Sequence, residues 1–113
     1  MAMKVKPLKN LTVLYPEENL IGEAVEDLNK ELEIFLNKKE LKFFLINLKN
    51  VTQIDSYALS ILATFGNEIK PKGGILVFSN LQPFIFSIFR MMRMDDIFEI
   101  FEEEEQAVAR FNE

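Results

Sequence analysis

Two stretches of the chain are apolar across their centres. Residues 41–48 read LKFFLINL and residues 74–79 read GILVFS, and neither alternates apolar with polar positions. A strand with one face in water shows that alternation, whereas a strand covered on both faces does not. Both stretches are therefore predicted to be central strands of a sheet that carries helices on both sides.

Four other segments have the pattern of helices. Residues 21–37 and 55–70 carry apolar side chains three and four positions apart, which gathers them on one helix face. Pro71 and the glycines at 73 and 74 end the second of these segments. Residues 84–94 form a third helix, with Pro83 suited to its first position. Residues 103–111 form a terminal helix that opens with acidic side chains.

Short strands complete the predicted order. Residues 5–9 and 11–15 form a hairpin around Asn10, and residues 97–101 form a final strand. The order β-β-α-β-α-β-α-β-α predicts an α/β fold with right-handed crossovers. We expect one domain over residues 1–113, with a mixed, mostly parallel sheet of four to five strands and about four helices. The first strand is expected to be antiparallel at an edge.

Composition removes several kinds of chemistry. The 113 residues contain no cysteine and no histidine, which excludes disulfides, thiolate nucleophiles, histidine bases and zinc sites built from these residues. The net charge of −5 argues against binding to nucleic acid. No apolar run approaches the roughly 20 residues that a membrane span needs. We therefore expect no metal, no cofactor, no nucleic acid partner and no membrane insertion.

The most informative window is residues 47–62, NLKNVTQIDSYALSIL. A buried strand leads through a polar connection into a helix, and Asp55 is well suited to cap that helix. Ser56 follows the cap directly, where the free N–H groups at a helix start favour a negative group such as phosphate. Asp55 would repel that phosphate. From the residues alone, capping of a helix and a regulatory site both remain open.

Residues 43–111 resemble the STAS family, which includes bacterial anti-sigma factor antagonists and the cytoplasmic tails of sulfate transporters. The family pattern is an apolar strand ending in Asp or Asn, a short segment, and Asp-Ser-Ser-Gly-Leu at the start of a helix. A glycine turn and a second apolar strand follow. Here the corresponding stretches read FFLINL, NVTQ, IDSYAL and KGGILVFSN. The predicted order of elements agrees with that of the family.

The resemblance implies a non-catalytic switch in a cytoplasmic bacterial protein. An unphosphorylated antagonist of this kind binds an anti-sigma factor that is also a serine kinase, and so frees the sigma factor for transcription. Phosphorylation at the helix start adds roughly two negative charges and separates the two proteins, and a phosphatase resets the switch. An alternative is a non-phosphorylated scaffold or interaction module in a larger regulatory complex. A small flavodoxin-like enzyme is a third hypothesis, which the residues disfavour because too few catalytic groups are present.

The sequence departs from the family motif at the residue that usually accepts the phosphate. Tyr57 and Ala58 stand where the second serine and the glycine are expected, whereas Asp55, Ser56 and Leu59 match. Three interpretations stay open: Ser56 accepts the phosphate instead, Tyr57 accepts it, or the switch is lost and binding is constitutive. We expect Ser56 to be the acceptor, with Asp55 as the cap and a candidate for recognition by the kinase.

The third predicted helix is the second candidate for a functional surface. Its spacing turns four side chains towards the core: Ile85, Ile88, Phe89 and Met92. Phe84, Phe86 and Met91 fall on other sides. These side chains are either partly core and partly exposed in the ordinary way, or they form a surface for a partner or a homodimer. Phe and Met are enriched in such surfaces, and Arg90 and Arg93 would lie at the rim. The candidate partner-binding residues are thus Asp55, Ser56, Tyr57, Phe84, Phe86 and Arg90.

The acidic run at 102–105 has a simpler interpretation. Four adjacent carboxylates do not converge as a calcium site requires. We expect them to form the solvated start of the last helix.

Overall fold

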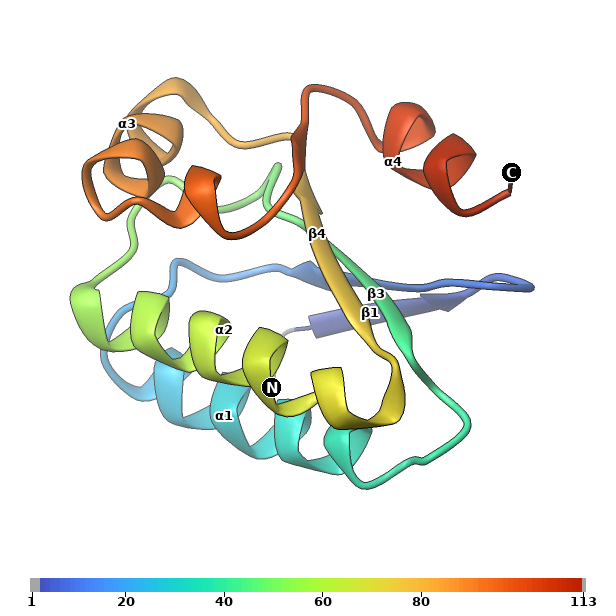
Figure 1. The fold of residues 1–113 in the computed structure, drawn as a ribbon. Coiled ribbons are helices and arrows are strands. Elements are labelled where there is room, and N and C mark those ends of the chain that lie inside the picture. The colour runs from blue at the N-terminus through green and yellow to red at the C-terminus, as the bar shows by residue number, and fades with distance from the viewer. Residues whose placement is uncertain (1–2, 113) are drawn as a thin grey trace.

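The computed structural model describes residues 3–112, which form a five-stranded sheet with helices on both faces (Figure 1). The strands lie side by side in chain order: β1 (Met3–Pro7), β2 (Thr12–Pro16), β3 (Phe43–Asn47), β4 (Ile75–Ser79) and β5 (Ile100–Phe101). β1 and β2 form an antiparallel hairpin, and each later strand is parallel to the one before it. The predicted mixed sheet with an antiparallel edge strand is confirmed.

Four helices and two 3₁₀ turns connect the strands. They are α1 (Glu23–Leu36), α2 (Ser56–Glu68), η1 (Lys70–Lys72), α3 (Pro83–Met91), η2 (Met94–Asp96) and α4 (Glu104–Phe111). The helices α1, α2 and α3 contribute to the larger core on one face of the sheet, and α4 covers the other face (Figure 1). The predicted order of strands and helices is confirmed.

Two predicted segments are shorter in the structure than expected. The third helix ends at Met91 rather than at residue 94, because Arg93 adopts a left-handed conformation with φ 60° and the chain turns into η2. Only Ile100 and Phe101 of the predicted strand over 97–101 pair with β4. Of the residues before them, Phe98 is buried, whereas Ile97 and Glu99 are exposed.

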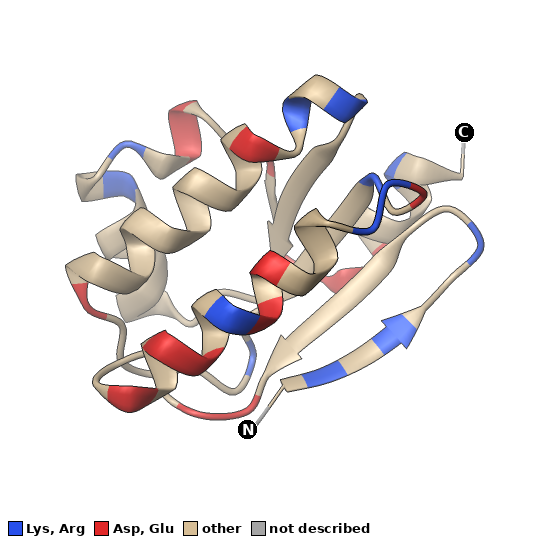
Figure 2. Cartoon of the chain, turned by 90° about the horizontal axis from the view of Figure 1, so that it is seen from below, with Lys and Arg blue, Asp and Glu red and all other residues tan. Residues whose placement is uncertain are grey.

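α1 shows how one helix serves the core and the solvent. Its apolar stripe is buried against the sheet: Val25, Leu28, Leu32 and Phe35. Figure 2 marks acidic positions along α1, and basic positions along β1 at the edge of the sheet. Glu23, Glu26 and Glu33 of α1 are exposed. Burial of the stripe holds the helix on the sheet, whereas the outward carboxylates keep that face hydrated.

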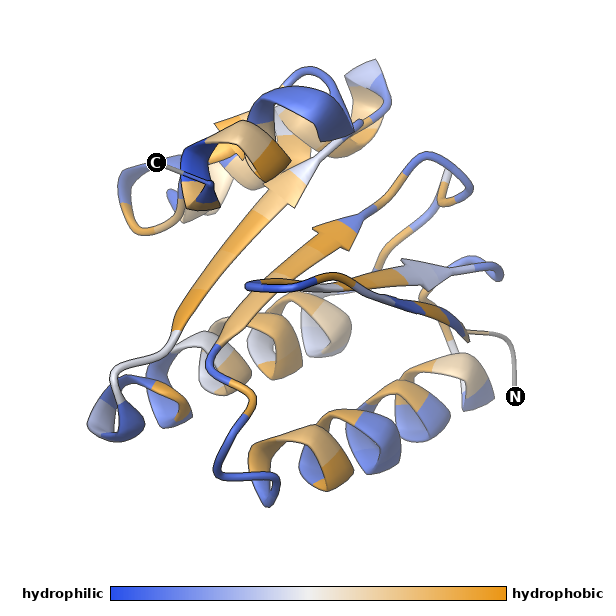
Figure 3. Cartoon of the chain, turned by 90° about the vertical axis from the view of Figure 1, so that its right-hand side faces the viewer, coloured by the Kyte–Doolittle hydropathy of each residue, from blue (hydrophilic) through white to orange (hydrophobic). Residues whose placement is uncertain are grey.

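The two central strands are buried on both faces, as their apolar runs predict. Phe44, Leu45 and Ile46 of β3 are all fully buried, and so are Val77 and Phe78 of β4. Figure 3 colours both strands as hydrophobic along nearly their whole length. Phe44 and Phe78 face the larger core, while Leu45 and Val77 face the smaller core under α4.

Phenylalanine rings fill the larger core edge to face. The Phe44 ring contacts those of Phe35 and Phe65, and its centroid lies 5.1 Å from that of Phe65. The Phe78 ring contacts those of Phe89 and Phe98, with centroids 5.1 and 5.5 Å away. Edge-to-face pairs of this kind add to the burial of apolar area. Six of the 11 phenylalanines of the chain take part in these contacts, which join α1, α2 and α3 to β3 and β4.

A glycine in α2 allows the segment before β5 to approach closely. A Cβ atom at Gly66 would lie 2.6 Å from Cζ of Phe98, well inside normal contact distance. The ring of Phe98 therefore rests directly on the backbone of α2. This contact fixes where η2 and β5 lie relative to the helix.

Replacing Gly66 with alanine is expected to lower the free energy of unfolding, because the methyl group overpacks the Phe98 ring at a cost of about 1–3 kcal/mol. The loss should outweigh the better helix propensity of alanine, which is worth roughly 1 kcal/mol. Urea unfolding followed by circular dichroism measures it. Asn67→Ala, at the exposed neighbouring position, is the matched control. An unchanged or raised stability for Gly66→Ala would contradict the close contact.

Candidate functional site

Three loops meet at the carboxyl edge of the sheet, where the candidate site lies. The loop after β2 pairs with the loop after β3, since the Leu20 N–H donates to the Gln53 carbonyl and the Asp55 N–H donates to the Leu20 carbonyl. Asn19 Oδ1 also accepts the backbone N–H of Thr52 at 2.8 Å. These bonds hold the start of α2 in a fixed position.

The third loop, after β4, is attached to the same place. Gln82 precedes α3, and its Nε2 donates to the carbonyl oxygen of Lys49 at 2.8 Å. Lys49 belongs to the loop that leads to α2. The starts of α2 and α3 therefore lie at the same edge of the sheet (Figure 1).

Asp55 caps α2, as the sequence predicts. Its backbone is extended, with φ −101° and ψ 172°, and its Oδ1 accepts the N–H of Ala58 at 2.8 Å. Ser56 is the first residue of the helix and is exposed, and Tyr57 is 49% exposed. Ala58 and Leu59 turn inward and are buried. Two hydroxyl groups thus stand in solvent at the helix start.

α3 presents the other half of the candidate surface. Ile85 and Phe89 are fully buried, whereas Phe84 is 62% exposed and Phe86 is 39% exposed. Arg90 is exposed and its guanidinium lies over the Phe86 ring, 5.9 Å from the centroid. The burial pattern favours the interpretation that this helix has an apolar outer face.

One expectation about α3 is wrong. Helical spacing predicts that Met92 faces the core with Ile85 and Phe89, but Met92 is 54% exposed, because the helix ends at Met91 and the chain turns away. Met91, at 75%, is exposed as well. Both methionines therefore add exposed apolar side chains at the end of α3.

The structure brings the two groups of candidate residues to one edge without joining them. Asp55, Ser56 and Tyr57 lie at the start of α2. The other group lies on α3, which begins directly after Gln82, the residue that is hydrogen-bonded to the loop before α2. Within residues 3–112, no hydrogen bond or ion pair links side chains of the two groups. A partner that contacts both groups would have to extend along the carboxyl edge of the sheet from the start of α2 to α3.

Glu104 is a residue of this region that sequence reasoning missed. Its Oε1 accepts the Tyr15 hydroxyl at 2.7 Å and Asn47 Nδ2 at 2.9 Å, and its Oε2 accepts Lys6 Nζ at 2.6 Å. The expectation that residues 102–105 form a solvated helix start is therefore wrong for Glu104, which is half-buried. One carboxylate ties α4 to β1, β2 and β3.

The same network reaches the loop before α2. Asn47 donates to Glu104 with its Nδ2, while its Oδ1 accepts the backbone N–H of Lys49 at 2.9 Å. The Lys49 carbonyl in turn accepts Gln82 Nε2. A chain of hydrogen bonds thus connects the start of α4, the loop before α2 and the start of α3.

The charge of Glu104 is stabilised by its partners. Burial raises the pKa of this carboxyl, but hydrogen bonds from Lys6, Tyr15 and Asn47 outweigh burial and hold the pKa below its ordinary value. The hydrogen bond to Glu104 correspondingly raises the pKa of Lys6. Burial also raises the pKa of Tyr15, so its hydroxyl stays protonated and donates.

Glu104→Gln is expected to lower the free energy of unfolding at pH 7 by about 1–2 kcal/mol, because charge-assisted hydrogen bonds are lost. A carboxyl whose pKa is depressed by folding stabilises the protein above its ordinary pKa of 4.5, and that contribution disappears as the pH falls through the folded value. The difference between native protein and variant should therefore shrink below about pH 4.5. Urea unfolding across a pH series measures it.

Glu105→Gln is the control, because Glu105 is exposed beside Glu104 and lies on the same helix. It should change the stability by less than about 0.5 kcal/mol. A Glu104→Gln effect that is the same at pH 3 as at pH 7 would contradict the ion pair as its source.

Among the described residues, no cluster of three or more acidic side chains could hold a metal ion. No helix between residues 3 and 112 has both the length and the apolar character needed to cross a bilayer.

Comparison with known proteins identifies the family. The family model of the STAS domain matches residues 2–107, nearly the whole chain. The chain belongs to the STAS domain family. No curated protein matches this STAS domain in sequence.

Solved structures share the fold of this STAS domain at low sequence identity. A Thermotoga maritima protein described as an anti-sigma factor antagonist is 20% identical, with a TM-score of 0.90 over 98% of this chain and 95% of that chain. SpoIIAA, an anti-sigma factor antagonist, is 16% identical in its unphosphorylated form, with a TM-score of 0.84 over 96% and 95% of the two chains. A sulfate transporter family protein from Wolinella succinogenes is 18% identical, with a TM-score of 0.78 over 96% and 89%.

Proposed function

We propose that this STAS domain is an anti-sigma factor antagonist that regulates transcription by reversible protein binding in the bacterial cytoplasm. Its partner would be an anti-sigma factor that is also a serine kinase, and a phosphatase would reset the switch. The observation that carries the proposal is the exposed Ser56 hydroxyl at the first residue of α2, at the same edge as the apolar outer face of α3. The proposed role is binding and includes no catalytic step by this chain.

Phosphate on Ser56 would change the site electrostatically. The free N–H groups and positive end of the α2 dipole favour an anion at this position. The hydrogen bond from the Ala58 N–H holds the Asp55 carboxylate at the start of the helix, so a phosphate on Ser56 would lie beside it. About two further charges at the edge would disfavour a partner that covers this carboxylate and the apolar side chains of α3.

Two features support a switch on Ser56 rather than on Tyr57. Ser56 carries its hydroxyl close to the backbone of the helix start, whereas the Tyr57 hydroxyl lies at the end of a ring that is 49% exposed. The second feature is the enzyme: a serine kinase acts on a small aliphatic hydroxyl and would phosphorylate a phenol poorly.

A structure of the same fold supports the presence of a switch. SpoIIAA occurs in a phosphorylated form, and that structure matches this chain with a TM-score of 0.72 at 17% identity.

Ser56→Glu is expected to weaken binding to the purified cognate anti-sigma factor at least tenfold, whereas Ser56→Ala should bind as the native protein does. The glutamate places a negative charge where the phosphate would stand. Isothermal titration calorimetry measures both affinities. Ser60→Glu, exposed one turn further along α2, is the matched control and should change the affinity by less than about threefold.

Phosphopeptide mass spectrometry after incubation with the kinase and ATP gives the second measurement. We expect one phosphate on Ser56 in the native protein and none in Ser56→Ala. Phosphate on a distant hydroxyl, or none at all with the kinase active on another substrate, would overturn the assignment to Ser56.

A second function is favoured by one observation. Tyr57 occupies the position of the usual phosphate acceptor and is exposed, as a contact residue of a permanent partner would be before binding. On that basis the domain would be a non-phosphorylated scaffold in a larger complex, or a homodimer. Unchanged binding by Ser56→Glu together with weakened binding by Tyr57→Ala would favour this function over the switch.

A further inference from the structure

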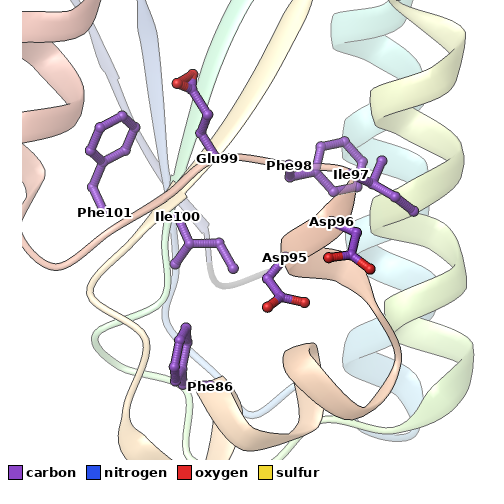
Figure 4. Close-up of a pocket in the computed structure, with 8 residues that line it drawn as sticks. All are labelled: Phe86, Asp95, Asp96, Ile97, Phe98, Glu99, Ile100 and Phe101. Atoms are coloured by element: carbon purple, nitrogen blue, oxygen red, sulfur yellow. The ribbon is translucent and has the colours of Figure 1, made fainter.

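An open groove runs between α3 and the segment that carries η2 and β5. It consists of two adjoining hollows of about 480 and 500 Å³, which share Phe86, Ile100 and Phe101. Figure 4 shows the first hollow, with Phe86 rising from α3 towards Ile100. Hollows of this size accept several side chains of a peptide.

The floor of the groove is apolar and incompletely covered. Phe86 is 39% exposed and Ile97 is 55% exposed, while Ile100 and Phe101 are half-buried. Leu81 and Pro83 continue the apolar lining into the second hollow. Such a floor favours apolar side chains from a partner.

The groove lies at an open edge of the sheet. β5 is the last strand and has β4 as its neighbour on one side. The carbonyls of Glu99 and Phe101 accept N–H groups from β4 and the residue after it. The alternation of a parallel ladder therefore directs the N–H and C=O of Ile100 to the open side. An extended segment placed there would have main-chain partners.

The rim of the groove is acidic. Asp95, Asp96 and Glu99 line the first hollow and Glu102 lines the second. Arg93 pairs with Asp96, and Arg110 pairs with Glu99. Within residues 3–112, Asp95 and Glu102 have no hydrogen bond or ion pair from a side chain. These carboxylates repel nucleic acid and anionic lipid and attract lysine and arginine.

We propose that this groove binds an extended segment of a partner protein in which apolar side chains alternate with lysine or arginine. Ile100 of β5 and Glu99, the residue before it, point to opposite sides of the chain (Figure 4). A segment added to this edge would direct alternate side chains to the same two sides. Its apolar side chains enter the hollow beside Phe86, and its basic side chains turn to the side of Glu99, where the carboxylates of Asp95 and Glu102 at the rim, unpaired within the described residues, still attract their charge. This binding does not depend on phosphorylation of Ser56.

The test uses a blocked peptide of alternating leucine and lysine, titrated into the ¹⁵N-labelled protein and followed by NMR. We expect the largest shifts in the backbone signals of Phe86 and residues 95–102, and weaker binding as salt is added. Two further peptides separate the contribution of the acidic rim from that of the apolar floor. One replaces lysine with glutamate and the other replaces leucine with serine, and each should bind at least fivefold more weakly than the leucine–lysine peptide.

The double variant Asp95→Lys with Glu102→Lys should weaken the leucine–lysine peptide roughly tenfold, because attraction at the rim becomes repulsion. The matched control is Glu23→Lys with Glu33→Lys, which makes the same change of charge at exposed positions of α1. The control should alter the affinity by less than about twofold. Both variants change surface side chains, so their spectra report whether each remains folded.

Three outcomes would overturn the proposal. Shifts spread along α1, or an equal loss in both double variants, would show attraction by net charge alone. Equal binding of the serine–lysine peptide would show that the apolar floor is not used. A mass that rises with concentration in light scattering, and that Asp95→Lys with Glu102→Lys abolishes, would identify a second copy of the chain as the occupant. None of these outcomes bears on Ser56, whose test uses another partner and another variant.

Discussion

The parallel pairing of β3 with β4 is the constraint on which the rest of the structure depends. Five residue pairs align from Phe43 with Ile75 to Asn47 with Ser79, and most of their side chains are buried. Strands that are apolar on both faces need cover on both faces. The three helices of the larger core supply it on one side and α4 on the other, so α4 is as necessary to the sheet as the longer helices.

The same pairing determines where the functional surface lies. Two parallel strands of equal length end at the same edge, so the loops that leave them emerge side by side. Asn47 and Ser79 are the last residues of these strands. The starts of α2 and α3 are therefore neighbours although the two helices begin 27 residues apart, at Ser56 and Pro83. The proposed partner surface follows from the register of the sheet rather than from any contact between the two helices.

Local chemistry explains what the sequence predicted well. The apolar runs of β3 and β4, the cap at Asp55 and the proline that starts α3 each depend on residues within a few positions, and the structure confirms all three. The role of Glu104 depends on Lys6, Tyr15 and Asn47, which lie between 57 and 98 residues away in the chain. No local pattern distinguishes this glutamate from its three acidic neighbours. The exposure of Met92 has a related cause, since helical spacing predicts which face a residue occupies only while the helix continues, and α3 ends at Met91.

Asn47 makes the end of β3 unusually intolerant of an isosteric exchange. Its amide must donate to a carboxylate with one atom and accept a backbone N–H with the other. Aspartate has the same shape, and the STAS pattern described above admits either residue at the end of this strand. In this chain an aspartate would set two carboxylates against each other at hydrogen-bond distance. Although the family pattern accepts aspartate or asparagine at this position, Glu104 of α4 therefore requires asparagine in this chain.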